Sequence, residues 1–241
     1  MILSELISRS PIRIFEQSLS GGLKAGEIGI IASPNGVGKT SVLVQLAMDK
    51  LLQGKKVIHV SFTHAMQHNQ YVPLWYEDIF DEITSKKNLE NAADIKNDLV
   101  KNRVLMSFNQ DGVTKEQILK SLRAMIIDGG FKADSIIIDG FDFSRIDIEG
   151  IKNVRNFAVE LDLSIWYSCS VKDSGRDNIP PVLDGFAGLI DIIITLQPKP
   201  DHVELSISRD RGDVITKSTA MNLDPKTLLI LEPQANLNRS Q

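Results

Sequence analysis

Two apolar runs constrain the fold of this chain more than any other feature. Residues 135–139 read Ser-Ile-Ile-Ile-Asp, and residues 191–196 read Asp-Ile-Ile-Ile-Thr-Leu. A strand with one face in water alternates apolar and polar residues, whereas a strand covered by helices on both faces does not. The two runs therefore predict the interior of a mostly parallel sheet flanked by helices, which is an α/β architecture.

Similar runs recur along the chain and alternate with segments of helical period. Strands are expected at residues 28–32, 56–62, 104–108, 135–139, 163–169, 191–196, 202–208 and 214–218. Helices are expected at 39–53, 115–128 and 148–161, where apolar residues recur three and four apart. The last strands follow one another with only turns between them, which predicts an antiparallel edge at the C-terminal end of the sheet.

Residues 64–102 are polar and predict an insertion over the sheet, with two short helices near 76–86 and 89–101. Its aromatic residues Tyr71, Trp75 and Tyr76 could stack a base, but anchoring the insertion to the core is the favoured interpretation, because single-strand binding also needs a sustained basic groove. A frayed tail is expected at 234–241. Without internal repeats or low-complexity linkers, residues 1–241 are predicted to form one domain.

The composition limits which cellular compartment and which classes of partner are expected. The chain has 241 residues, 27 basic and 31 acidic side chains and one cysteine. Cys169 has no partner for a disulfide within the chain and is expected to pack in the core, which favours a reducing, cytoplasmic location. No secretory signal is recognised, and the longest apolar run, 186–196, is shorter than the roughly 20 residues of a membrane span. The net charge of −4 does not support a nucleic-acid partner, although a local basic groove is compatible with it.

The strongest chemical signal is the loop Ser-Pro-Asn-Gly-Val-Gly-Lys-Thr at residues 33–40, between a predicted strand and a predicted helix. Glycines let successive backbone N–H groups approach an anion, and the helix N-terminus adds its positive dipole end. The loop therefore predicts a nucleotide site, although Ser33 stands where the usual pattern has glycine. The expected nucleotide-binding residues are Asn35, Gly36, Val37, Gly38, Lys39, Thr40 and Ser41.

Two further roles follow from the chemistry of phosphates. Lys39 is expected to reach the β- and γ-phosphates, and Thr40 to offer its hydroxyl to Mg²⁺. A magnesium ion that bridges phosphates also needs a carboxylate, directly or through water. Asp139, at the end of the run 135–139, supplies it. Thr40 and Asp139 are therefore the predicted metal-binding pair.

The lead-in to the loop carries a family resemblance. Residues 20–27, Ser-Gly-Gly-Leu-Lys-Ala-Gly-Glu, together with the following strand and loop, resemble the RecA superfamily of P-loop NTPases, and especially its KaiC-like and hexameric-helicase branch. The likeness spans most of residues 12–220. It implies a RecA-like ATPase core that uses ATP or ADP with Mg²⁺ and often assembles into a homo-oligomeric ring, with the nucleotide between neighbouring subunits.

One feature of that family is missing. The resemblance implies a glutamate that polarises the attacking water, placed just after the strand that follows the loop helix; Thr63 and His64 occupy those positions. The other common place for such a base, next to Asp139, is Gly140. General-base catalysis is typically worth about 10²–10⁴-fold in rate. We therefore expect weak or absent hydrolysis, unless His64 or Asp142 takes over the role.

A second family feature is matched. Arg209 and Arg211 resemble the paired basic finger that this branch directs at the γ-phosphate of a neighbouring subunit. Residues i and i+2 of a strand share a face, so both guanidinium groups could meet one anion, which their planar donor forks suit. A solvated basic strand end is an equally weighted interpretation. Ser168 and Ser170 match the position of a phosphate sensor, but serines at a strand end more often begin a turn.

Three classes of function remain open. The first is a nucleotide-dependent regulatory or assembly protein with little ATPase activity and a protein partner, which the missing glutamate favours. The second is an active ATPase that works on nucleic acid, like a recombinase or helicase. The third is a KaiC-like kinase that transfers phosphate to its own hydroxyl groups. The first is the preferred hypothesis.

Overall fold

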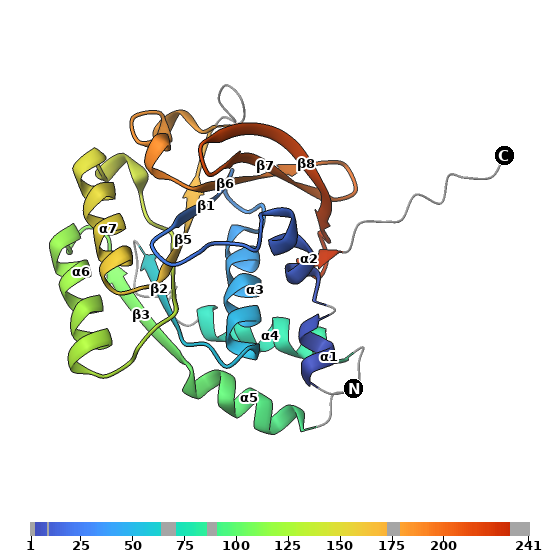
Figure 1. Cartoon of the computed structure of the whole chain (residues 1–241). Helices are drawn as coiled ribbons and strands as arrows, with labels where there is room; N and C mark the ends of the chain where they lie inside the picture. Colours follow the sequence, from blue (N-terminus) through green and yellow to red (C-terminus); the bar gives the residue numbers. More distant parts are fainter. Residues whose placement is uncertain (1–2, 9, 64–70, 86–90, 173–178, 232–241) are drawn as a thin grey trace.

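The apolar runs form a sheet in the computed structural model of the protein, which describes residues 3–8, 10–63, 71–85, 91–172 and 179–231 (Figure 1). Within these residues the sheet has nine strands in the order β3-β2-β4-β5-β1-β6-β7-β8-β9. The strands are β1 Ile28–Ser33, β2 Val57–Thr63, β3 Arg103–Asn109, β4 Ser135–Asp139, β5 Ser164–Ser170, β6 Ile192–Pro198, β7 Val203–Asp210, β8 Asp213–Leu223 and β9 Ile230–Leu231.

The sheet is parallel from β3 to β6 and antiparallel from β6 to β9. Both the parallel interior and the antiparallel C-terminal edge were predicted and are confirmed. Because β5 lies between β1 and β4, the carboxyl ends of these three strands meet at one edge of the sheet. In open α/β sheets, ligands bind outside the carboxyl ends of the parallel strands.

Each parallel strand is apolar on both faces because each face belongs to a separate core. In β4, Ile136 and Ile138 belong to the core beneath α6 and α7, whereas Ile137 belongs to the opposite core beneath α3. All three are nearly inaccessible to solvent. Figure 1 shows α6 and α7 on one side of the sheet and α3 with the remaining helices on the other. This arrangement accounts for the absence of polar alternation in the sequence.

Helices α3 Lys39–Leu52, α6 Lys115–Arg123 and α7 Ile148–Glu160 each connect two parallel strands, and short 3-10 turns lie at Phe143–Arg145, Pro181–Leu183 and Ala187–Leu189. The predicted helix 115–128 changes type within its length, since Ala124–Asp128 is a π-helix. Its last turn closes with a hydrogen bond from Gly129 N to Ala124 O (2.8 Å). The chain leaves the helix through Gly130, whose positive φ of 67° suits glycine.

The predicted insertion contains α4 Tyr71–Ser85 and α5 Ala92–Lys101, both packed on the α3 side of the sheet. Tyr76 anchors α4 as expected, since it is only 2% exposed. Its hydroxyl oxygen lies 3.0 Å from His59 Nδ1, and the Arg103 guanidinium lies over its ring. The predicted tail at 234–241 and His64 lie outside the described residues. In the part of the chain that is described, no helix has the length and apolar character to cross a membrane.

Two N-terminal helices were not predicted, α1 Leu3–Ser8 and α2 Pro11–Ser18. Helix α2 buries Phe15 against α3 and brings two acids and two bases together in the interface. Arg13 Nε lies 3.2 Å from Asp49 Oδ1, and Lys50 Nζ lies 2.9 Å from Glu16 Oε1. Burial of these pairs raises the pKa of Asp49 to about 6, against the opposing effect of the Arg13 charge.

Candidate functional site

The loop at residues 33–40 connects the end of β1 to the start of α3, as predicted. Gly36 and Gly38 have positive φ values of 79° and 112°, which glycine adopts without strain. A Cβ atom on Gly38 would also lie 2.5 Å from Leu223 Cδ2. Residues 34–36 are exposed, so the backbone of this part of the loop faces solvent. The loop can therefore present backbone donors to an anion.

Lys39 folds back over the loop. Its ammonium group donates to the carbonyl oxygens of Ser33 (3.0 Å) and Pro34 (2.9 Å), and the residue is only 8% exposed. Burial lowers the pKa of Lys39 below its ordinary value of 10.5, although the Asp139 carboxylate opposes this effect. The charge thus lies inside the loop, where an incoming phosphate would replace two carbonyl partners by stronger anionic acceptors.

Thr40 and Asp139 are brought into direct contact. Thr40 Oγ1 donates a hydrogen bond of 2.7 Å to Asp139 Oδ2, although the two residues are separated by 99 positions in the chain. Helix α3 positions the hydroxyl and the end of β4 positions the carboxylate. A hydroxyl beside a carboxylate at the carboxyl edge of the sheet is a donor set that suits Mg²⁺ on a nucleotide.

A self-sufficient metal site is absent from the described segments, since none of them forms a group of three or more His, Cys, Asp or Glu side chains able to hold an ion. Thr40 and Asp139 supply only two oxygen ligands. Mg²⁺ usually completes its coordination with waters and substrate phosphates, and only one or two carboxylates from the protein. The residues present therefore fit a magnesium ion that arrives with a nucleotide.

The Ser41 side chain is engaged by the C-terminal part of the sheet. It is fully buried and donates a hydrogen bond of 2.6 Å to Leu228 O, and Gln45 Nε2 donates to the same carbonyl at 2.9 Å. Gln45 Oε1 in turn accepts from Ile230 N. The Ser41 hydroxyl thus holds the turn between β8 and β9 against the start of α3, and only the backbone N–H of Ser41 remains for its expected nucleotide-binding role.

Gly140 leaves no room for a catalytic acid beside Asp139. It has a φ of 80°, and a Cβ atom there would lie 2.7 Å from Phe62 O. Its N–H donates to Ser168 Oγ at 2.8 Å, which fixes the turn after β4. Ser168 is buried within β5 and accepts from this turn rather than beginning a turn of its own; Ser170 is exposed at the end of β5.

The second candidate base, Asp142, is already engaged. Its Oδ1 accepts hydrogen bonds from Ser144 N (3.0 Å) and Ser144 Oγ (2.6 Å), and Arg145 Nε lies 3.4 Å from Oδ2. The hydrogen bonds from Ser144 lower the pKa of Asp142, and the Arg145 charge lowers it further. Partial desolvation opposes them, but the pKa stays below its ordinary value. A carboxylate stabilised in this way is a weak base and caps the short helix that begins at Phe143.

The two finger candidates do not share a strand face. Strand β7 ends at Asp210, and Arg211 lies in the following turn with a φ of 44°. The expected i, i+2 geometry of Arg209 and Arg211 is therefore wrong, because the second arginine has left the strand. Arg209 pairs with Ile193 near the beginning of β6, and β6 begins beside the start of β1. Both arginines thus lie at the edge of the sheet opposite the loop 33–40.

Arg211 instead holds the lead-in segment 20–27 of its own chain. Its guanidinium donates to both carboxylate oxygens of Glu27 (2.9 and 3.0 Å), to Leu19 O (2.9 Å) and to Gly22 O. Asp210 Oδ1 accepts a further bond of 2.8 Å. Burial alone would raise the pKa of Glu27, but hydrogen bonds from Arg211 and the backbone bring it below its ordinary value of 4.5. Arg209 donates from Nε to Ile190 O at 3.0 Å.

Sequence reasoning missed His59, which lies on β2 on the same side of the sheet as Asp139. Its neighbour Ser61 pairs with Asp139 in the β2–β4 register. Burial lowers the pKa of His59 to about 4, against the attraction of Asp139, so the ring is neutral at pH 7. Its Nε2 has no partner among the described residues. A histidine within an otherwise apolar strand was the available signal. Cys169 is buried as expected, and desolvation raises the pKa of its thiol to about 12.

Comparison with models of known protein families finds no match for this chain. Comparison with curated proteins likewise finds no significantly similar sequence. The site must therefore be interpreted from its own geometry.

Proposed function

We propose that the chain is a RecA-like P-loop protein that binds ATP with Mg²⁺, hydrolyses it slowly or not at all, and acts as a nucleotide-dependent regulatory or assembly factor. The observation that carries the proposal is the 2.7 Å contact between Thr40 Oγ1 and Asp139 Oδ2 beside the glycine loop 33–40. Loop, lysine, hydroxyl and carboxylate are the four elements that P-loop NTPases combine around a nucleotide–magnesium complex.

Each group has a distinct task in this proposal. Backbone N–H groups of residues 35–41 hold the phosphates, with the N-terminus of α3 adding its dipole. Lys39 exchanges the Ser33 and Pro34 carbonyls for phosphate oxygens. Thr40 and Asp139 hold Mg²⁺, which neutralises phosphate charge when it is bound. ADP contacts the same loop but lacks the γ-phosphate.

The low rate of hydrolysis follows from the surroundings of Asp139. Gly140 cannot carry an acidic side chain without a clash with Phe62 O, and Asp142 is held by Ser144 and Arg145. The median turnover of enzymes is about 10 per second. Loss of a general base costs about 10²–10⁴-fold, so we expect turnover on the order of 10⁻³–10⁻¹ per second.

Nucleotide binding is tested by titrating the protein with ATP and with ADP in the presence of Mg²⁺, followed by calorimetry. Lys39→Ala should weaken ATP binding by about tenfold or more, because one charge-assisted hydrogen bond is worth about 1.5–3 kcal/mol. Lys132→Ala is the matched control, since Lys132 is an exposed lysine away from the loop. Absence of ATP binding, or equal binding by wild type and Lys39→Ala, would overturn the proposal.

Self-assembly is tested separately by sedimentation without nucleotide, with ADP and with ATP. We expect a larger species in ATP alone. Arg211 donates from all three of its guanidinium nitrogens within its own chain, whereas Arg209 donates only from Nε among the described residues, so Arg209 has N–H groups left to contact a neighbouring subunit. Arg209→Ala should therefore reduce assembly while leaving ATP affinity unchanged. An unchanged monomer under all three conditions would remove the assembly role but not the nucleotide site.

A further inference from the structure

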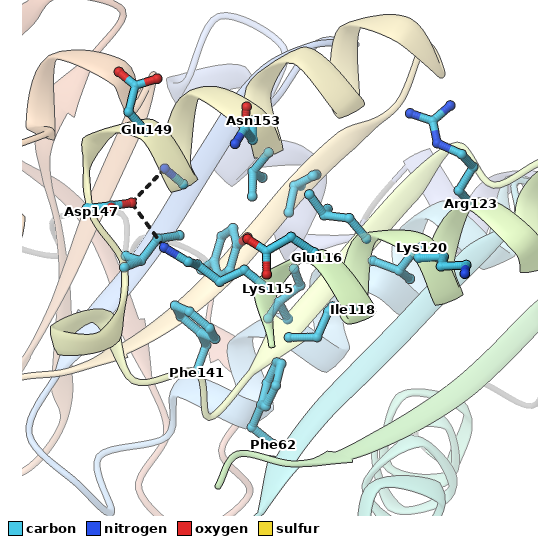
Figure 2. Close-up of a pocket in the computed structure, with 18 residues that line it drawn as sticks. Phe62, Lys115, Glu116, Ile118, Lys120, Arg123, Phe141, Asp147, Glu149 and Asn153 are labelled. Carbon is cyan, nitrogen blue, oxygen red and sulfur yellow. Dashed lines mark hydrogen bonds and ion pairs between the residues drawn. The ribbon is translucent and has the colours of Figure 1, made fainter. Parts of the chain in front are cut away.

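A cavity of about 510 Å³ lies between α6 and α7, on the face of the sheet opposite α3 (Figure 2). Its wall is mainly apolar and includes Phe62, Ile118, Leu122, Ile138, Phe141 and Tyr167. Charged residues form its rim: Figure 2 shows Arg123 and Glu149 directed away from the interior and Lys115 paired with Asp147. The wall is therefore mainly apolar; Glu116, which also lines the cavity and has no dashed partner in Figure 2, is exposed to solvent.

A smaller cavity of about 190 Å³ adjoins the first, because the two share Phe62, Lys115, Glu116, Ile118 and Phe141 in their walls. Gln110 lines only the smaller one. The combined space lies within the size range of ordinary small-molecule sites, which are about 300–1,000 Å³, largely apolar and furnished with a few polar groups.

The Gln110 side chain provides an unused hydrogen-bond donor. It is 5% exposed, and its Oε1 accepts a hydrogen bond of 3.2 Å from Asp142 N. This bond assigns the oxygen, so the other terminal atom is the amide nitrogen. Gln110 Nε2 is buried and has no partner in the described part of the chain. A buried donor without an acceptor costs free energy that a bound acceptor would recover.

Tyr167 provides a second polar group in the wall. It is 3% exposed, and its ring packs edge-on against Phe141 and Phe143 at centroid distances of 5.9 and 5.3 Å. Burial raises the pKa of the phenol, which therefore stays protonated. No hydrogen bond of its hydroxyl is found within the described ranges. The cavities thus combine mainly apolar walls with two available donors, and the Glu116 carboxylate in their lining is exposed to solvent.

We propose that these adjoining cavities bind a small, uncharged organic molecule with an aromatic or aliphatic body and a hydrogen-bond acceptor, such as a carbonyl oxygen, directed at Gln110 Nε2. The apolar walls contact the body of the molecule, and the donor selects molecules with an acceptor. A buried polar group left unpaired discriminates against ligands that lack its partner. This site is separate from the loop 33–40 and does not depend on nucleotide binding.

The test compares two probes of similar shape, acetophenone and ethylbenzene, which differ by a carbonyl oxygen. Isoleucine methyl NMR signals of the full chain report binding, with Ile118 and Ile138 as cavity residues. At roughly millimolar concentration, the range expected for ligands of this size, acetophenone should shift both signals and bind about tenfold more tightly than ethylbenzene. Equal affinities, or no shift by either probe, would overturn the proposal.

Three variants complete the test. Gln110→Leu should abolish the preference for acetophenone, whereas Gln17→Leu, the same change at an exposed position on α2, should retain it. Leu119→Trp places a larger side chain in the cavity wall and should remove binding of both probes. Ile138 signals and circular dichroism establish that each variant is folded; if Leu119→Trp is not, Leu119→Phe replaces it. Retention of the preference in Gln110→Leu would refute the role of the donor.

Discussion

Replacing Arg211 with alanine tests whether this arginine stabilises its own chain. The change removes two hydrogen bonds to Glu27, one to Asp210 Oδ1 and those to Leu19 O and Gly22 O. It leaves Glu27 with the backbone N–H of Lys24 at 2.8 Å as its remaining hydrogen-bond donor in the described residues. The interaction is largely shielded from solvent, since the two side chains are 22% and 15% exposed.

The expected loss of stability follows from these contacts. Removing one partner of a fully buried ion pair costs about 3–5 kcal/mol, whereas exposed pairs are worth about 0–1 kcal/mol. Arg211 and Glu27 are intermediate in exposure, so we expect Arg211→Ala to lower the free energy of unfolding by about 2–3 kcal/mol relative to wild type. At about 2–4 °C per kcal/mol for a chain of this size, Tm should fall by about 4–12 °C.

The assay is urea denaturation without nucleotide, followed by circular dichroism. Arg209→Ala is the matched control, because Arg209 makes one hydrogen bond to a backbone carbonyl and should cost about 1 kcal/mol. A double-mutant cycle with Glu27→Gln should give a coupling energy of about 1–2 kcal/mol. If Arg211→Ala is as stable as wild type but fails to assemble in ATP, Arg211 contacts a neighbouring subunit and the intrachain role is refuted.

Three further predictions concern the site and the N-terminal helix. Gly140→Glu should not create ATPase activity and should lower stability by about 1–3 kcal/mol, since the backbone is left-handed there and the Cβ would meet Phe62 O; a rise in phosphate release would contradict this. Asp139→Asn should weaken ATP binding more in the presence of Mg²⁺ than in its absence; calorimetric titrations with and without chelator measure the difference. The pKa of Asp49 is raised from 3.8 to about 6 in the folded protein, so between these two pH values folded Asp49 retains a proton that the unfolded chain releases. The free energy of unfolding therefore falls as pH rises from about 4 to about 6. Asp49→Asn should remove this loss, so its stability relative to wild type should increase from about pH 4 to pH 7 in urea titrations; a constant difference would contradict the assignment.

The sheet and the loop were predictable because their signals are local. Buried parallel strands carry unbroken apolar runs, and residues 135–139 match β4 at both ends. The loop 33–40 combines two glycines with a lysine and a threonine at the junction of a strand and a helix. Its contact with Asp139 was inferred from chemistry alone, since Thr40 and Asp139 are 99 positions apart.

The missed features depend on contacts between distant segments or on single backbone angles. Arg211 lies in the turn after β7, where the backbone has a positive φ. Its side chain therefore does not share a strand face with Arg209 and instead bonds to Glu27. The Ser41 hydroxyl donates a hydrogen bond to Leu228 O, which lies 187 positions further along the chain. Helix α2 had a readable signal, Pro11 at its first position, that was overlooked. The cavity between α6 and α7 depends on helix packing, which periodicity does not determine.

A single-turnover measurement tests the central proposal most directly. Protein in excess is mixed with Mg²⁺ and ATP labelled at the γ-phosphate, and both bound nucleotide and released phosphate are followed over time. The account predicts that ATP binds to wild type but only weakly to Lys39→Ala, and that bound ATP is hydrolysed at no more than about 10⁻¹ per second. Hydrolysis with a rate constant of several per second that Lys39→Ala abolishes would contradict it.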